Sequence, residues 1–307
     1  MIEFEGRTSL PEGVEAAIVA TRKRLAGLGS NDFLDPALAA PAMELLNRGG
    51  KLFRPAILFM GALAVGEEPI NYIDLAVAVE LLHSSSLMHD DVIDEDERRR
   101  GDATVHEKYG EHAAVIAGDA LISKAVQQAC NYGAPVVEYV SKAAMEMCAG
   151  EMVDYRCQRE CTIPSIGQYL RIIELKSASL IGASAAAPAI HKKSPHAASL
   201  ESFGRGVGMA FQIRDDIIDW LGIDVSDSLP STTDRIAFRP NIISSLTNGG
   251  GKTEREAVSE AVSLNNRYIS EAVMRAEEVG AADLAAYASI VRLDIREVLA
   301  GYRGKAP

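Results

Sequence analysis

Two aspartate triplets with the same spacing are the residues of this 307-residue chain best suited to chemistry. Each reads Asp-Asp-x-x-Asp, and their members are Asp90, Asp91 and Asp94, then Asp215, Asp216 and Asp219. In a helix, positions i and i+4 share a face, so the outer carboxylates of each triplet repel one another unless a cation lies between them. Carboxylate oxygens are ligands that hard cations prefer. The triplets therefore predict several Mg²⁺ ions held between two helices and clamping a diphosphate.

Polar side chains extend the first triplet along one helix face. His83, Ser86, Asp90 and Asp94 follow one another at spacings of three, four and four, which aligns them in a stripe. The carboxylates end this stripe, and the small hydroxyl residues 84–86 form its floor. A site with metal at one end and an apolar shaft below it suits a substrate with a charged head and a long apolar tail.

Several basic residues stand near these carboxylates or at expected helix starts. They are Lys51, Arg54, Arg99, Arg100 and Lys176. Lys51 and Arg54 follow the pair Gly49-Gly50 and precede a helix, and helix N-termini with adjacent Lys or Arg bind phosphate oxygens. Arg99 comes soon after the first triplet, so acidic and basic groups alternate around one locus.

The elements that must position these residues are helices, because the hydrophobic periodicity is helical nearly throughout. A long helix over residues 72–94 carries the first triplet, and another over 197–221 carries the second. A charged loop is expected at 95–102, a loop or lid at 222–239, and a last helix at 281–299. Without a convincing strand, the pattern predicts one all-α domain over residues 1–307.

Composition narrows the function further. The chain is 48% hydrophobic, which suffices for a large core, and its net charge of −12 argues against binding nucleic acid or docking on an anionic membrane. The start lacks the pattern of a signal peptide, and the longest uncharged apolar stretch, 177–190, is too short for a transmembrane segment. The spacing of the four cysteines does not indicate a zinc site, and we expect them to be reduced thiols. A cytoplasmic location is therefore expected.

Ordered motifs over roughly residues 45 to 245 give the chain a close resemblance to the trans-isoprenyl diphosphate synthase family. They are Gly49-Gly50-Lys51-x-x-Arg54-Pro55, Glu80-Leu-Leu-His83, the first triplet, Arg99-Arg100-Gly101, Ala117-Gly118-Asp119, Gly150-Glu151-x-x-Asp154, Lys176-Ser177, and Phe211-Gln212 followed by the second triplet. Each motif alone is weak, but their order and spacing together are specific. The resemblance implies a large helical bundle around a central cavity, and a homodimer.

The resemblance also implies a role for each site residue. Asp90, Asp91, Asp94 and Asp215 hold Mg²⁺ against the allylic diphosphate, with Asp216 and Asp219 beside or among the metal ligands. Arg99 and Lys176 neutralise the leaving diphosphate, while Lys51, Arg54, His83 and Arg100 bind isopentenyl diphosphate. Gln212 orients the second triplet or the substrate, and Ser177 flanks the carbocation. Three Mg²⁺ ions are expected, with Mn²⁺ as an alternative.

The implied reaction is the condensation of isopentenyl diphosphate with an allylic diphosphate. Metal and basic side chains stabilise the departing diphosphate, and the allylic C–O bond ionises. The isopentenyl double bond attacks the allylic cation, and a proton is then lost. The surrounding apolar wall must exclude water, which would quench the cation as an alcohol.

Three departures from the family pattern stand out. Lys176-Ser177 replaces Lys-Thr, and Glu151 replaces the usual Gln. After the second triplet, where the family commonly has two lysines, this chain has Arg235 and Arg239, to which no role is transferred.

Product length is expected to depend on the residues just before the first triplet. Ser85 and Ser86 stand five and four positions before Asp90, where bulk often floors the product cavity in this family. Neither is aromatic, so the sequence predicts geranylgeranyl diphosphate, with twenty carbons, or a longer chain.

Other functions remain as alternatives. A farnesyl diphosphate synthase would belong to the same family. A class I terpene cyclase ionises the same substrates, but the second aspartate triplet and the Lys51, Arg54 and His83 set argue against it. A non-catalytic partner subunit typically loses one triplet, and both are intact here.

Overall fold

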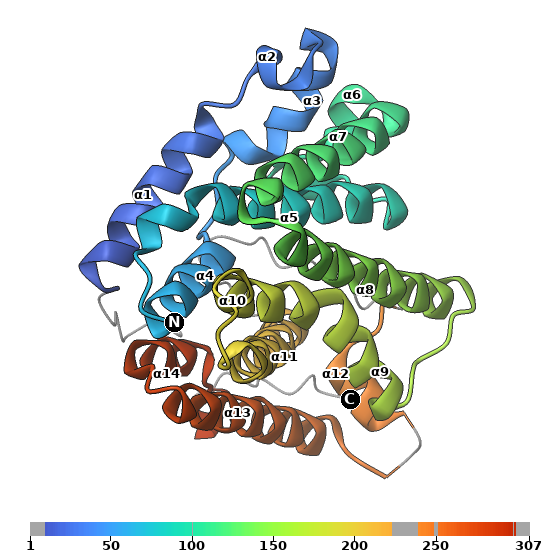
Figure 1. Cartoon of the computed structure of the whole chain (residues 1–307). Helices are drawn as coiled ribbons and strands as arrows, with labels where there is room; N and C mark the ends of the chain where they lie inside the picture. Colours follow the sequence, from blue (N-terminus) through green and yellow to red (C-terminus); the bar gives the residue numbers. More distant parts are fainter. Residues whose placement is uncertain (1–9, 100, 223–238, 249–250, 297, 299–307) are drawn as a thin grey trace. The chain divides into compact units, whose positions relative to one another are not determined.

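The chain folds almost entirely into helices, which confirms the all-α prediction (Figure 1). The computed structural model describes residues 10–99, 101–222, 239–248, 251–296 and 298. Its α-helices are α1 (Glu12–Ala26), α2 (Ser30–Phe33), α3 (Pro36–Asn47), α4 (Phe53–Ala64), α5 (Ile73–Ile93), α6 (Val105–Tyr109), α7 (Glu111–Ala129), α8 (Ala134–Arg159), α9 (Ile166–Ile173), α10 (Ser179–His191), α11 (Ala197–Leu221), α12 (Ile242–Thr247), α13 (Glu254–Glu278) and α14 (Ala282–Ala288). Short 3-10 turns occupy Pro69–Tyr72, Cys130–Tyr132 and Ser289–Val291, and a π-helical segment occupies Glu174–Ala178.

Local sequence signals explain where several helices begin. The Asp35 carboxylate accepts a hydrogen bond from the Ala37 amide, and Pro36 takes the first helical position of α3. Helices α9 and α13 start with capping boxes, Ser165 with Gln168 and Thr253 with Glu256. In each box, two backbone amides that have no partner inside the helix are satisfied by side chains.

The structure divides into two compact units. The N-terminal unit comprises Leu10–Ala144 and Ala183–Glu201, and the C-terminal unit comprises Met145–Gly182 and the described residues from Ser202 onward. Helices α8, α10 and α11 contribute residues to both. The expectation of a single domain over residues 1–307 stays a prediction.

In the N-terminal unit, α5 and α7 lie side by side (Figure 1). Gly118 of α7 permits this close approach, because a Cβ atom added there would lie 2.1 Å from Nε2 of His89 on α5. The Ser85 hydroxyl of α5 donates a hydrogen bond of 2.9 Å to the Gly118 carbonyl across the same contact. The helix that carries the first triplet is therefore fixed against α7 through small residues.

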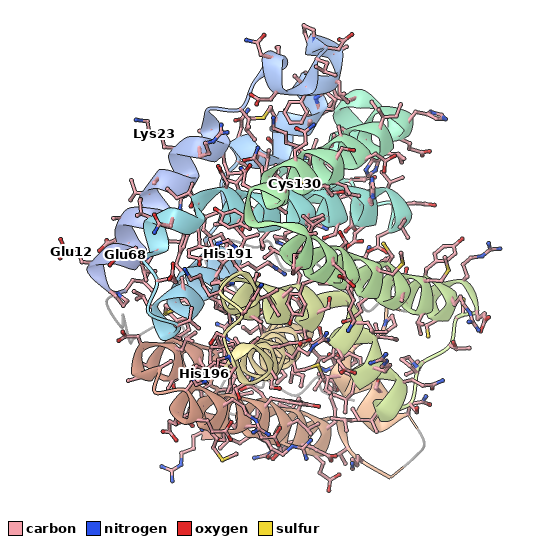
Figure 2. The ribbon with its side chains drawn as sticks, in the orientation of Figure 1. Glu12, Lys23, Glu68, Cys130, His191 and His196 are labelled. Carbon is pink, nitrogen blue, oxygen red and sulfur yellow. The ribbon has the colours of Figure 1, made fainter. Side chains whose placement is uncertain are left out.

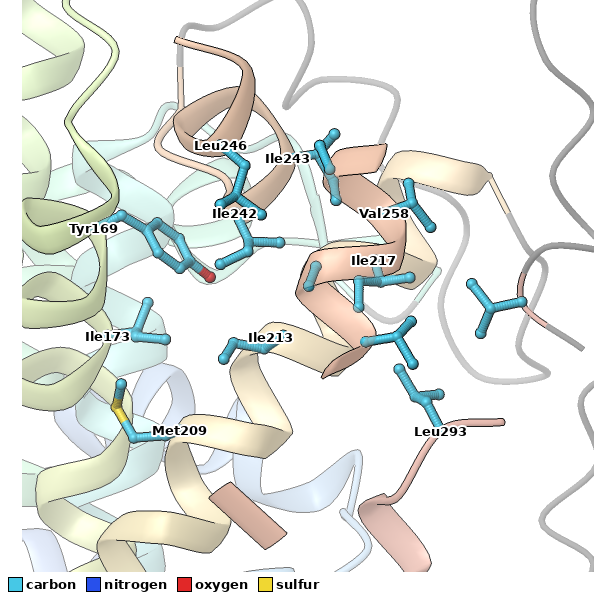
Figure 3. Close-up of a cluster of buried hydrophobic side chains, with 14 of the residues drawn as sticks. Tyr169, Ile173, Met209, Ile213, Ile217, Ile242, Ile243, Leu246, Val258 and Leu293 are labelled. Carbon is cyan, nitrogen blue, oxygen red and sulfur yellow. The ribbon is translucent and has the colours of Figure 1, made fainter. Parts of the chain in front are cut away.

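In the C-terminal unit, a core of apolar side chains surrounds the second half of α11 (Figure 3). Met209, Ile213 and Ile217 lie on one face of α11 and pack against residues of α9, α12 and α13. The π-helical segment contributes Ala178 to this core. This packing fixes the helix that carries the second triplet.

The structure corrects two details predicted from the sequence. The charged loop expected at 95–102 overlaps a short antiparallel hairpin in which β1 (Arg98–Arg99) pairs with β2 (Asp102–Ala103). The helix expected over 281–299 ends at Ala288 and continues as a 3-10 turn to Val291. Within the expected loop at 222–239, residues 223–238 lie outside the described part of the chain.

None of the described helices is both long and apolar enough to cross a membrane. All four cysteines are free thiols, and Cys130, which follows α7, is exposed (Figure 2).

Candidate active site

The first triplet stands at the C-terminal end of α5, where its members have different surroundings. Asp90 and Asp94 are half-buried, whereas Asp91 is only 1% exposed. The Arg99 guanidinium donates a hydrogen bond from Nε to Asp91 Oδ1 at 2.5 Å. Burial raises the pKa of the Asp91 carboxyl, and the charge of Arg99 opposes this rise. Asp91 therefore anchors Arg99, while its two neighbours in the triplet remain partly accessible.

The hairpin that carries Arg99 is held by a residue that the sequence analysis missed. Arg48, at the end of α3, donates hydrogen bonds to the carbonyls of Arg99 and Ala103, at 3.2 and 2.6 Å. It also pairs with Glu44 at 3.0 Å. Guanidinium groups commonly make several such bonds at once, because their five N–H donors form a rigid fork. The only sequence signal for a role of Arg48 was its position directly before Gly49-Gly50.

The remaining predicted residues of the N-terminal unit have varied environments. Lys51 is exposed ahead of α4, and Arg54 is half-buried in the first turn of that helix. His83 and Ser86 are half-buried on α5, and the Ser86 hydroxyl donates to the His83 carbonyl of its own helix. Ser85 is buried against α7 through its bond to Gly118. Arg100 lies outside the described residues.

The second triplet, on α11, also has a buried central member. Asp215 and Asp219 are half-buried, but Asp216 is 7% exposed. Three donors reach the Asp216 carboxylate: the Tyr169 hydroxyl at 2.7 Å, Gln212 Nε2 at 2.9 Å and the Ile242 amide at 2.9 Å. This carboxylate thereby ties α9 and the start of α12 to α11.

Tyr169 is a residue that the sequence analysis did not identify. Burial is the main cause that raises the pKa of its hydroxyl well above the usual range, and the charge of Asp216 adds to the rise. The hydroxyl therefore stays protonated and acts as a donor. A tyrosine 47 residues before its partner carries no local sequence signal.

Gln212 links this network to the π-helical segment. Its side-chain oxygen accepts a hydrogen bond of 2.8 Å from the Ser177 hydroxyl. Ser177 and Gln212, which were both predicted to bind substrate, are thus hydrogen-bonded to each other. Gln212 in turn connects this pair to Asp216. These residues, with Tyr169 and Lys176, line a cavity of about 70 Å³ in the C-terminal unit.

Lys176 lies between two carboxylates of α8. Its Nζ is 2.6 Å from Glu151 Oε2 and 2.8 Å from Asp154 Oδ2. The backbone of Lys176 packs on Gly150, where an added Cβ would lie 2.6 Å from the backbone nitrogen of Lys176. The motif that contains Gly150, Glu151 and Asp154 was noted in the sequence without a role. Its i, i+3 spacing, which places both carboxylates on one helix face, was the available signal.

The carboxylate oxygens of the two triplets are chemically suited to a hard divalent cation. In the part of the chain that the structure describes, however, no group of three or more His, Cys, Asp or Glu side chains is arranged to hold a metal ion. In each triplet the central carboxylate is already bonded to protein donors. Asp90, Asp94, Asp215 and Asp219 are the half-buried members of the two triplets.

Comparison with known proteins identifies the family. The sequence model described as polyprenyl synthetase matches residues 35–234, which include both aspartate triplets. The chain belongs to the polyprenyl synthetase family. It is a trans-prenyltransferase of the isoprenyl diphosphate synthase class.

Individual relatives agree with this assignment. The chain is 32% identical over 273 residues to a short chain isoprenyl diphosphate synthase of Methanothermobacter thermautotrophicus, which covers 86% of this chain and 83% of the relative. It is 29% identical to a geranylfarnesyl diphosphate synthase of Natronomonas pharaonis, over 81% and 79% of the two chains. The structure superposes on a geranylgeranyl pyrophosphate synthetase from the archaeon Geoglobus acetivorans with a TM-score of 0.78 and 26% identity, covering 91% and 99% of the chains.

Proposed function

We propose that this protein condenses isopentenyl diphosphate with an allylic diphosphate to give geranylgeranyl diphosphate or a longer trans-polyprenyl diphosphate. The observation that carries the proposal is the family match over residues 35–234, within which the two aspartate triplets, Lys51, Arg54 and Lys176 all fall. A chain that retains both carboxylate sets and a basic set for a second diphosphate has the groups that a two-substrate condensation needs.

The proposed metal ligands are Asp90, Asp94 and Asp215, with Asp219 beside them. The donor chemistry of these partly accessible carboxylates supports this choice. Bound Mg²⁺ would act as a Lewis acid on the diphosphate oxygens of the allylic substrate. Asp91 and Asp216, which the sequence analysis also placed among the metal residues, instead position Arg99 and the start of α12 in this proposal.

The chain's own side chains supply the rest of the proposed chemistry. Arg99 and Lys176 bind the leaving diphosphate and stabilise its developing charge as the allylic C–O bond breaks. Lys51, Arg54 and His83 hold isopentenyl diphosphate, whose double bond forms the new C–C bond with the cation. A proton then leaves the resulting cation and passes to the released diphosphate. Apolar side chains around the reacting carbons exclude water.

The direct test is a turnover assay with purified protein, Mg²⁺, isopentenyl diphosphate and farnesyl diphosphate, followed by sizing of the dephosphorylated products. We expect consumption of isopentenyl diphosphate and products of twenty or more carbons. Asp90→Ala and Asp215→Ala should each lower kcat by a factor of about 100 or more, since each removes a charge-stabilising ligand. Unchanged turnover in both variants would reject their role, and cyclised products without isopentenyl diphosphate consumption would indicate a terpene cyclase.

Product length is proposed to depend on Ser86 and Ser85 ahead of the first triplet. Ser86→Phe should shorten the product by at least one five-carbon unit, because bulk just before the first triplet often floors the product cavity in this family. The change should leave the packing of α5 intact, because the half-buried Ser86 bonds only within its own helix in the described contacts. Ser85→Phe is expected to shorten it as well, but with a loss of stability, because Ser85 is packed against Gly118 of α7. Chain-length profiles with melting temperatures separate the two effects, and unaltered profiles would remove both residues as determinants.

A homodimer is also proposed. Helix α7 exposes Val115, Ile116, Ile122 and Val126, with Ile116 58% exposed. Val115, Ile122 and Val126 are seven and four positions apart and share one face of the helix, and Ile116 flanks them about 100° around the helix axis. A band of exposed apolar side chains is typical of a protein interface. Sedimentation analysis should give a dimer for the wild type and a monomer for Ile116→Glu. A monomeric wild type would reject the proposal.

A further inference from the structure

The lysine expected to bind the substrate diphosphate is held by more negative charge than it carries. Lys176 Nζ lies 2.6 Å from Glu151 Oε2 and 2.8 Å from Asp154 Oδ2, so one positive charge faces two carboxylates. The side chains of the three residues are 25%, 14% and 12% exposed, in the order Lys176, Glu151, Asp154. At such burial, solvent and salt screen the interactions only weakly. An approaching anion therefore meets an ammonium group that is already in contact with two carboxylates.

The backbone of Lys176 packs tightly against the helix that carries both carboxylates. The residue lies in the middle of the π-helical segment, whose backbone packs directly on Gly150 of α8. A Cβ atom at position 150 would lie 2.6 Å from the Lys176 nitrogen and 2.9 Å from the Leu175 Cβ, so the two backbones are already as close as they can be. The flexible side chain of Lys176 can carry its ammonium group from one partner to another without a change in this backbone contact.

The two carboxylates differ in their relation to the cavity. Asp154 and Lys176 both line the cavity of about 70 Å³, together with Ser177 and Gln212. Glu151 is not among its lining residues and approaches the ammonium group from α8, one helical turn before Asp154. Removing the charge of Glu151 would therefore leave Asp154, which lines the cavity, in contact with Lys176 Nζ.

We propose that Glu151 is an affinity-determining residue that competes with the substrate diphosphate for Lys176. While Glu151 holds the ammonium group, a diphosphate must displace it, and this weakens binding of the allylic substrate. The competition also favours release of the diphosphate product, since the carboxylate recaptures Lys176. The inference rests on the proposed binding of diphosphate by Lys176.

The test uses Glu151→Gln, which keeps the shape of the side chain and removes its charge. Isothermal titration with inorganic diphosphate in the presence of Mg²⁺ should show a Kd about tenfold lower than in the wild type, as expected for removal of a weakly screened like charge next to the ligand. The KM for the allylic diphosphate should fall in parallel, with kcat unchanged or reduced. An equal or higher Kd in a variant with the wild-type melting temperature would overturn the proposal.

Glu146→Gln is the matched control. Glu146 also lies on α8, is 21% exposed in its side chain, and pairs with Arg205 at 2.6 Å. Its neutralisation should leave the Kd for diphosphate within twofold of the wild type. A tenfold gain in this control would attribute the effect to overall charge and overturn the proposal.

A second variant secures the result against a folding defect. Diphosphate binding should weaken in Lys176→Gln. Adding Glu151→Gln to that variant should improve diphosphate binding by less than a third of the improvement that Glu151→Gln gives in the wild type, because the two residues act through one contact. Additive effects would overturn the competition. If Glu151→Gln fails to fold, Glu151→Asp, which retracts the carboxylate, should still lower the Kd. A wild type that binds diphosphate but consumes no isopentenyl diphosphate would refute the proposed function and leave the competition intact.

Discussion

At the scale of single residues, the two aspartate triplets share one pattern of burial and hydrogen bonding. The central aspartate of each is buried and bonded to protein donors, and the outer members are half-buried. Asp91 fixes Arg99, and Asp216 accepts from Tyr169, Gln212 and Ile242. A buried carboxylate needs such donors, because an unpartnered charge in the interior is very costly. Each triplet thus combines structural and chemical roles within five residues.

Tyr169→Phe tests the structural role of Asp216. The variant removes one of three donors to a buried carboxylate, so the free energy of unfolding should fall by about 1–3 kcal/mol. Urea unfolding at neutral pH measures this change. Tyr155→Phe is the control, since the Tyr155 hydroxyl meets only Arg159 in the described contacts and its loss should cost less than about 0.5 kcal/mol. Equal effects in the two variants would contradict the role of Asp216 as a structural hub.

The sequence identified the chemical residue types at the site but not their partners. The spacing of the triplets, Lys51 with Arg54, and Lys176 were visible because each stands in a short local motif. The bond from Tyr169 to Asp216 joins residues 47 positions apart, and Arg48 reaches a carbonyl 55 positions away. Such contacts depend on tertiary packing, which no local pattern encodes. The metal set, the substrate roles and the convergence of the two triplets stay predictions.

At the scale of elements, the helices followed from periodicity and capping signals. The start of α3 is marked by such signals, because the Asp35 side chain caps the helix and Pro36 takes its first position. The π-helical segment at Glu174–Ala178 was not predicted, because the uncharged stretch 177–190 that begins within it has no charged face to reveal a change of phase. The hairpin at 98–103 was missed because its charged residues have low strand propensity, and Arg48 holds it from outside.

Gly150→Ala tests the contact between α8 and the π-helical segment. The added methyl group would overlap the Lys176 nitrogen, so we expect a loss of about 1–3 kcal/mol in the free energy of unfolding. Gly167→Ala on α9 has nothing within 4 Å of the added Cβ and should be neutral or stabilising by up to about 1 kcal/mol. Chemical denaturation compares the two variants, and a harmless Gly150→Ala would show that the backbones are not in tight contact.

At the scale of the whole molecule, tyrosines whose pKa is raised in the folded state should limit stability at alkaline pH. Burial raises the pKa of Tyr132 to about 12, and its ring stacks on Tyr72 and meets the edge of His191, which is labelled in Figure 2. The folded state therefore favours the neutral phenol, whereas the unfolded chain ionises near pH 10. Stability from this group is complete below about pH 10 and is lost as the pH rises toward 12.

Tyr132→Phe should separate this contribution from that of the other tyrosines. The variant lacks the hydroxyl that bonds to the Asn71 carbonyl, so it should be less stable than the wild type at pH 8. The difference between the two proteins should narrow from pH 10 upward, because only the wild type carries the titrating phenol at this position. Urea unfolding between pH 8 and 11 measures the difference, and a constant gap would contradict the raised pKa.

The π-helical turn at Glu174–Ala178 also constrains which insertions and deletions this region can accept. Each residue advances a helix by about 100°, so the extra residue in the π turn resets the rotational phase of everything that follows. Because of this reset, Tyr169 and Ile173 before the turn and Ala178 at its end all reach the same core. Deleting one residue here would relax the backbone into ordinary α geometry and swing Lys176 off the carboxylate face of α8. The region should therefore tolerate substitutions far better than changes in length.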